Sequence, residues 1–140
     1  MKFYVIIDTN VIASALYTKN ENSPTVKVLE KLYSNDLILV YSDDIFEEYK
    51  DVLNRDYFDI PNSAIRTFIN FVKDNGIRIS HPNELKVIIP DMDDLIFYEL
   101  VMDKTFIADK FLITGNIKDY PNDPRIVTPA EFMEIFNSRK

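Results

Sequence analysis

The sequence predicts an α/β fold in which helices cover both faces of a parallel sheet, and two observations support this. Short runs rich in β-branched and aromatic residues recur along the chain, and segments with helical periodicity separate them. Strands that alternate with helices are typical of parallel sheets covered on both sides. The length of 140 residues is usual for one domain, so we expect a single domain over residues 1–140.

The first strand is expected over residues 2–7, a run that is apolar on both faces, as in a buried central strand. Asp8-Thr9-Asn10 follows it directly and begins a helical pattern. The next helix is expected to begin at Ser23-Pro24, since serine is a good capping residue and proline suits the first helical position.

The second strand is expected over residues 37–41, and Ser42 is expected to cap a helix that runs to about residue 53. The remaining elements follow the same alternation. They are helices over residues 62–74 and 90–102, strands over 77–79, 111–114 and 126–127, and a last helix opened by the capping box Thr128-Pro129-Ala130-Glu131.

The composition excludes several classes of protein. Because the chain has no cysteine, disulfide frameworks, zinc–thiolate sites and cysteine nucleophiles are excluded. It has only two glycines, so no glycine-rich phosphate loop is present. No segment reaches the ~20 apolar residues of a transmembrane helix, and the first apolar run is too short for a signal peptide. These features favour a cytoplasmic protein that is not embedded in a membrane.

The net charge of −7 is unusual for a protein that binds nucleic acid, because such proteins are typically basic. Two arrangements would reconcile this charge with a nucleic-acid ligand. A protein can concentrate acids at a metal site and still present a few lysines, or its acidic surface can receive a basic partner protein.

Asp8 is the first candidate site residue, because it comes directly after the first strand. Sites in open parallel sheets form beyond the carboxyl ends of the strands. Thr114-Gly115-Asn116 ends the expected fourth strand, so the two strand ends would meet if these strands are neighbours. Asp8 is either a metal ligand or a helix cap, and its position alone favours neither.

Other acids lie on two expected helices. Glu48 is at the border of the inward face of its helix, where it is either a ligand or a partner in a surface ion pair. Asp91, Asp93 and Asp94 open a later helix, where each acid would gain only ~0.3–1 kcal/mol from the helix dipole. Three acids exceed what capping requires, and the helical wheel leaves the choice between Asp93 and Asp94 open.

Carboxylate oxygens, with no cysteine and with His81 as the single histidine, favour hard cations such as Mg²⁺ or Mn²⁺ over zinc. Carboxylate-bound magnesium is a recurring solution for phosphodiester hydrolysis. We expect His81 itself to be a surface loop residue without a catalytic role.

Four motifs together resemble the PIN-domain family and span nearly the whole chain in the right order. They are residues 5–11 (VIIDTNV), Tyr41-Ser42 with residues 48–53 (EYKDVL), residues 90–94 (PDMDD) with Phe97, and residues 111–116 (FLITGN). The most similar branch is the bacterial VapC-like toxins of toxin–antitoxin pairs.

This resemblance implies a three-layer α/β/α fold with a central parallel sheet of about five strands. It implies a Mg²⁺- or Mn²⁺-dependent endoribonuclease that acts as a toxin on an RNA substrate, with an antitoxin protein as partner and possible assembly as a homodimer. The implied metal ligands are Asp8, Glu48 and Asp94, and Asp91 matches an accessory acid. The family positions that orient the acids and water are matched by Thr9, Asn10 and Thr114.

Asn116 departs from the family pattern, because many members carry an acid at the matching position. An amide oxygen still ligates a metal or its water, so Asn116 is kept as a catalytic candidate, but a second ion should bind more weakly. Asp119 is a possible substitute, although Tyr120-Pro121 suggests that it lies in a turn.

The alternative is a catalytically weak PIN domain that binds RNA or a protein without cutting. A phosphoacceptor receiver domain is disfavoured, because Asp8 stands alone and the third strand ends in Ile79-Ser80, without an acid.

Overall fold

The computed structural model describes residues 3–80, 82, 84–104 and 108–139. Within these ranges the chain forms five strands, six α-helices and three short 3₁₀ helices. The strands make one sheet in the order β3-β2-β1-β4-β5, and every neighbouring pair is parallel. Their bounds are Phe3–Ile7 (β1), Leu37–Tyr41 (β2), Ile77–Arg78 (β3), Lys110–Ile113 (β4) and Ile126–Val127 (β5).

β1 is the central strand, as its apolar sequence predicts. Val5 lies opposite Leu39 of β2 on one side and Phe111 of β4 on the other. Val5, Ile6 and Ile7 are fully buried, because the strand is covered on both faces as well as on both edges. The residue that follows β1 therefore lies at the middle of the carboxyl edge of the sheet.

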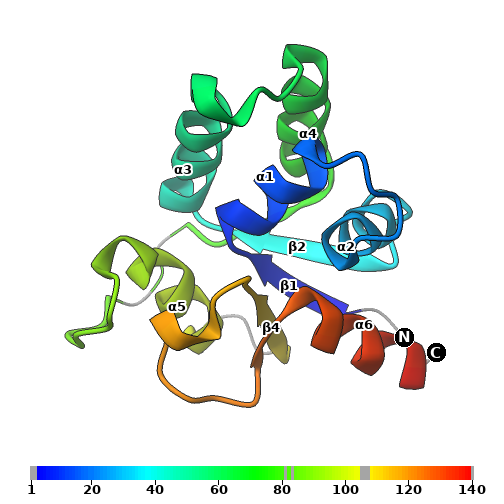
Figure 1. The fold of residues 1–140 in the computed structure, drawn as a ribbon. Coiled ribbons are helices and arrows are strands. Elements are labelled where there is room, and N and C mark those ends of the chain that lie inside the picture. Colours follow the sequence, from blue (N-terminus) through cyan, green and yellow to red (C-terminus); the bar gives the residue numbers. More distant parts are fainter. Residues whose placement is uncertain (1–2, 81, 83, 105–107, 140) are drawn as a thin grey trace.

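Helices cover both faces of this sheet, so the fold has three layers, α/β/α (Figure 1). One side carries α1 (Thr9–Tyr17), α2 (Pro24–Tyr33), α3 (Asp43–Leu53) and α4 (Asn62–Asn75). The opposite side carries α5 (Leu95–Met102), which contacts β1 and β4. The last helix, α6 (Pro129–Ser138), packs beside α2. No helix among the described residues is both long enough and apolar enough to cross a membrane.

Side-chain caps begin two of these helices as predicted. The Ser42 hydroxyl accepts a hydrogen bond from the Ile45 amide at 3.3 Å. Thr128 and Glu131 form the reciprocal capping box, with bonds of 3.1 and 2.9 Å. Ser23 does precede α2, but its hydroxyl pairs with the Thr25 hydroxyl and makes no capping bond.

The helix expected over residues 90–102 is the main difference from the prediction. The chain first forms a 3₁₀ turn, η2 (Met92–Asp94), and the α-helix begins only at Leu95. The Asp91 carboxylate accepts a hydrogen bond from the Asp93 amide at 3.0 Å, which stabilises this tighter first turn. Two predictions fall outside the described residues. They are the start of the first strand at Lys2 and the surface loop at His81.

We expect the two glycines to differ in their tolerance of a side chain. A Cβ on Gly76 would lie 2.7 Å from the Val72 carbonyl oxygen and 2.8 Å from the Tyr41 ring, whereas a Cβ on Gly115 would meet nothing within 4 Å. Gly76→Ala should therefore lower the free energy of unfolding by about 1–3 kcal/mol, and Gly115→Ala by less than about 0.5 kcal/mol. Urea unfolding of both variants measures this, and equal losses would contradict the packing argument.

Candidate functional site

The carboxylate of Asp8 is buried at the end of β1, with only 6% of the residue exposed. Its Oδ2 atom accepts hydrogen bonds from the Thr114 hydroxyl at 2.9 Å and from the Tyr120 hydroxyl at 3.1 Å. Its backbone amide donates to the Ile113 carbonyl at 2.9 Å. The ends of β1 and β4 therefore meet, as the sequence led us to expect.

Burial is the main cause of the raised pKa of Asp8, and the hydrogen bonds from Thr114, Tyr120 and the Asn10 amide only partly oppose it. The amide of Asn10 lies 3.4 Å from Oδ1, so Asp8 also caps α1. The structure thus confirms Asp8 as a helix cap, and it places the carboxylate at the sheet edge, where its role as a metal ligand stays a prediction.

Glu48 reaches the same edge from α3. The Thr9 hydroxyl donates to its Oε2 atom at 2.9 Å, and the fully buried Tyr49 anchors α3 by donating to the Ile7 carbonyl at 2.6 Å. Burial raises the pKa of Glu48, and repulsion by Asp8 adds to the effect, while the bond from Thr9 opposes it. Other acids of this helix make the surface ion pairs; Glu47 does so with Lys50, at 2.9 Å between carboxylate oxygen and ammonium nitrogen.

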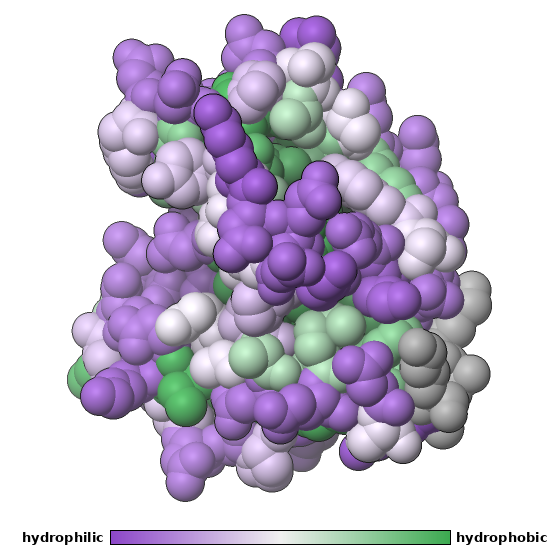
Figure 2. All heavy atoms as spheres, turned by 45° about the vertical axis from the view of Figure 1, so that its right-hand side comes forward, coloured by the Kyte–Doolittle hydropathy of each residue, from purple (hydrophilic) through white to green (hydrophobic). Residues whose placement is uncertain are grey.

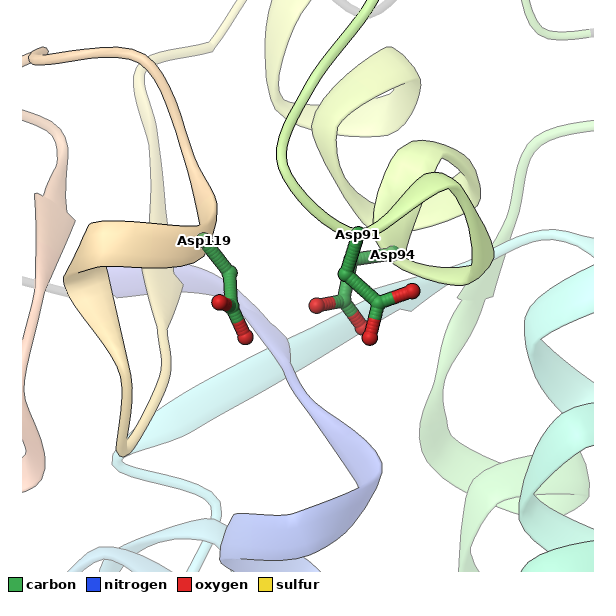
Figure 3. Close-up of side chains that lie close together, drawn as sticks. All are labelled: Asp91, Asp94 and Asp119. Carbon is green, nitrogen blue, oxygen red and sulfur yellow. The ribbon is translucent and has the colours of Figure 1, made fainter.

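Three further acids converge beside Asp8. Asp91, Asp94 and Asp119 each offer a carboxylate oxygen, and these oxygens lie within 4.8 Å of one another. Figure 3 shows Asp91 and Asp94 at the start of the α5 segment and Asp119 facing them from η3 (Ile117–Asp119), with the end of β1 below. Asp93 is exposed and does not belong to the group, so the geometry favours Asp94 over Asp93.

No ion pair among the described residues neutralises the shared negative charge, although the charge of Arg55 partly offsets that of Glu48. Burial, followed by repulsion from Asp8, Asp91 and Asp119, raises the pKa of Asp94 from its ordinary value of 3.8 to about 7. In the part of the chain that the structure describes, no lysine or arginine forms an ion pair with any of the five acids of this site, which are Asp8, Glu48, Asp91, Asp94 and Asp119.

Asn116 is exposed at the N-terminal end of η3. Its backbone amide donates to the Thr114 hydroxyl at 3.2 Å, and its side chain makes no hydrogen bond to the described residues. Asp119 ends the same 3₁₀ turn, and its backbone amide donates to the Asn116 carbonyl at 3.1 Å. Asp119, and not Asn116, lies with Asp91 and Asp94.

Two site residues escaped the sequence analysis in part or in full. Asp119 was considered only as a substitute for the acid missing at Asn116. Its spacing of three residues from Asn116 was the available signal, because one 3₁₀ turn connects the two positions. Tyr120 was not considered at all, because a tyrosine before a proline carries no local sign that its hydroxyl will meet an acid 112 residues earlier.

The donor set suits a divalent cation. All five acids offer oxygen ligands, which hard cations prefer, and their mutual repulsion would be relieved by positive charge. A hollow of about 760 Å³ opens nearby, lined in part by Asp44 of α3 and by Leu95 and Glu99 of α5. Figure 2 shows an indentation on the side of the molecule where α3 faces α5, surrounded by hydrophilic residues. None of the five acids lines this hollow. Their own exposure makes the group accessible, because Asp91 is exposed and Asp94 and Asp119 are half-buried.

A comparison with protein families matches residues 4–118 to a family described as PIN domain. No curated protein and no solved structure matched the chain. The matched segment runs from β1 to η3 and contains Asp8, Glu48, Asp91 and Asp94, and it ends one residue before Asp119. PIN domains are generally nucleases and typically use divalent metal ions. The match covers most of the sequence and agrees with the five-stranded parallel sheet, so the chain belongs to the PIN-domain family.

Proposed function

We propose that this PIN domain is a Mg²⁺- or Mn²⁺-dependent endoribonuclease that hydrolyses phosphodiester bonds in RNA. The observation that carries the proposal is the group of acids at the carboxyl edge of the sheet, which no ion pair to the described residues compensates. Acids that repel one another in this way lower the stability of the fold unless a cation neutralises them. Carboxylates with raised pKa values are also typical of functional sites.

The proposed metal ligands are Asp8, Glu48 and Asp94, and Asp119 supplies the acid that Asn116 lacks. The closeness of Asp94 and Asp119 supports this assignment. Asp91 is an accessory acid in the same group. Residues that orient the ligands are Thr9, which holds Glu48, together with Thr114 and the Asn10 amide, which hold Asp8.

In the proposed reaction, the chain binds and orients the reacting groups. A bound divalent cation would neutralise charge on the scissile phosphate and lower the pKa of a water molecule. Thr9 and Thr114 keep the carboxylates of Glu48 and Asp8 in fixed positions, so these ligands need little reorganisation on binding. In the metal-free protein the pKa of about 7 keeps the Asp94 carboxyl partly protonated near neutral pH, so it would give up this proton on becoming a ligand.

The biological setting that we propose is a cytoplasmic toxin–antitoxin pair, in which a partner protein restrains the nuclease and the nuclease assembles as a homodimer. The net charge of −7 supports a basic partner, because opposite charge speeds association and suppresses wrong partners.

The second candidate function is a catalytically weak PIN domain that binds RNA or protein without cutting. The amide at Asn116 favours this alternative, because it removes one negative charge from the family pattern. Metal titration of RNA cleavage distinguishes the two functions, since a binding module would show RNA affinity without metal-dependent product.

Removing one charge from the site should abolish cleavage. We expect Asp8→Asn and Asp94→Asn each to lower Mg²⁺-dependent cleavage of RNA at least roughly 100-fold. Loss of an outer-shell partner costs up to this factor, and loss of a direct ligand should cost no less. Asp93→Asn is the matched control, because Asp93 is exposed in the same turn and lies outside the acidic group. Wild-type cleavage by Asp8→Asn would refute the nuclease proposal.

Asp119 and Asn116 should contribute differently to the Mg²⁺ dependence of cleavage. Asp119→Asn is expected to raise the Mg²⁺ concentration for half-maximal cleavage on the order of 10-fold, whereas Asn116→Ala should change it much less. Asn116→Asp should increase cleavage by adding a charge beside the existing group. A larger loss from Asn116→Ala than from Asp119→Asn would show that the fourth ligand is at position 116.

The metal-free protein should lose stability as the pH rises. Because the pKa of Asp94 is about 7 in the folded state and ordinarily 3.8, the folded state binds its proton more tightly. This stabilisation is present below about pH 4 and is lost as the pH rises through about 7. With EDTA present, Asp94→Asn should melt a few degrees above wild type at pH 8 and close to it at pH 5.

Melting curves with Mg²⁺ complete that test, since a ligand that binds only the folded state raises the melting temperature. Mg²⁺ should raise the melting temperature of wild type at pH 8 and that of Asp94→Asn much less. A metal-free Asp94→Asn protein that is less stable than wild type at pH 8 would show that the charge of Asp94 is compensated.

A further inference from the structure

Tyr120 is a buried side chain that contacts the site and has no role in the proposed reaction. It follows Asp119 at the end of η3, and 5% of the residue is exposed. Its hydroxyl donates a hydrogen bond of 3.1 Å to Oδ2 of Asp8. Burial, with Asp8 and Asp94 nearby, raises the pKa of Tyr120 well above its ordinary value, so the hydroxyl keeps its proton and remains a donor.

The two oxygens of Asp8 have different surroundings. Oδ2 accepts hydrogen bonds from the hydroxyls of Tyr120 and Thr114, which fills the two acceptor positions of a carboxylate oxygen. Oδ1 accepts only the long bond of 3.4 Å from the Asn10 amide among the described residues. Oδ1 is therefore the atom of Asp8 that retains a lone pair for a cation.

The same hydrogen bond links two segments that are far apart in the sequence. Tyr120 is adjacent to Asp119, and its own amide donates to the Ile117 carbonyl at 3.2 Å, which closes the 3₁₀ turn. Because the side chain of Tyr120 is fixed to Asp8, the turn that carries Asp119 is held over the end of β1.

We propose that Tyr120 is a positioning residue whose hydroxyl orients Asp8 so that Oδ1 faces a bound divalent cation, and whose attachment to Asp8 fixes the turn that carries Asp119. This inference rests on the proposed function, because it assumes that Asp8 and Asp119 bind the cation. The opposing interpretation is that Tyr120 only fills space in the core, and a phenylalanine ring would do this equally well.

Tyr120→Phe separates the two interpretations, because it removes the hydroxyl and keeps the ring. The measurement is Mn²⁺ binding to the metal-free full-length chain by isothermal titration calorimetry, without RNA. We expect the dissociation constant for Mn²⁺ to rise on the order of 10-fold. The Mg²⁺ concentration for half-maximal cleavage should rise in parallel, while the cleavage rate at saturating Mg²⁺ should fall less.

Tyr33 provides the matched control, because it is a tyrosine away from the acids. Its hydroxyl is buried and has no hydrogen-bond partner among the described residues. Tyr33→Phe should therefore leave Mn²⁺ affinity unchanged.

Thr114→Val is a second variant that tests the same oxygen, since it removes the other hydroxyl from Oδ2. It should weaken Mn²⁺ binding in the same direction as Tyr120→Phe, and circular dichroism checks that both variants are folded. Unchanged Mn²⁺ affinity in Tyr120→Phe, or an equal loss in Tyr33→Phe, would overturn the positioning role while the nuclease proposal stands. Absence of Mn²⁺ binding to wild type would overturn both.

Discussion

Much of the carboxyl edge of this fold depends on one constraint, the burial of the Asp8 carboxylate at the end of a fully apolar strand. A buried charged group is costly unless hydrogen bonds replace its water. Asp8 obtains these bonds from residues that are 106 and 112 positions away in the sequence, Thr114 and Tyr120. The requirements of one side chain thus fix the pairing of β1 with β4 and the position of η3. Glu48 is positioned in the same way, because the hydroxyl of Thr9, the next residue after Asp8, donates a hydrogen bond to it.

The same constraint explains why the edge of the sheet is electrostatically unfavourable. Hydroxyl donors stabilise Asp8 without neutralising it, so repulsion by Asp8 adds to burial, the larger cause, in raising the pKa of Asp94 to about 7. The fold tolerates this because its stability comes from elsewhere, including the tilted and edge-to-face contacts among the rings of Phe3, Phe111 and Phe132. An arrangement that costs stability at one edge and is supported by a large core is typical of a functional site.

Local patterns account for what could be predicted. The apolar run before Asp8, the cap at Ser42 and the capping box at Thr128 each depend on neighbouring residues, and the structure confirms all three. The choice between Asp93 and Asp94 could not be made from a helical wheel, because the segment begins with a 3₁₀ turn that the wheel does not describe. Tyr120 could not be found, because its contact with Asp8 depends on how distant segments pack and not on any local pattern.

The position of η3 changes the interpretation of Asn116. In the sequence it is a missing acid, which weakens the case for a nuclease. In the fold Asn116 precedes a 3₁₀ turn that ends at Asp119. Asp119 lies with Asp91 and Asp94, which supports our proposal that it supplies the acid that position 116 lacks. The hydroxyl of Tyr120 ties this turn to Asp8, so the proposed exchange of one acid position for another depends on a hydrogen bond made by the very next residue.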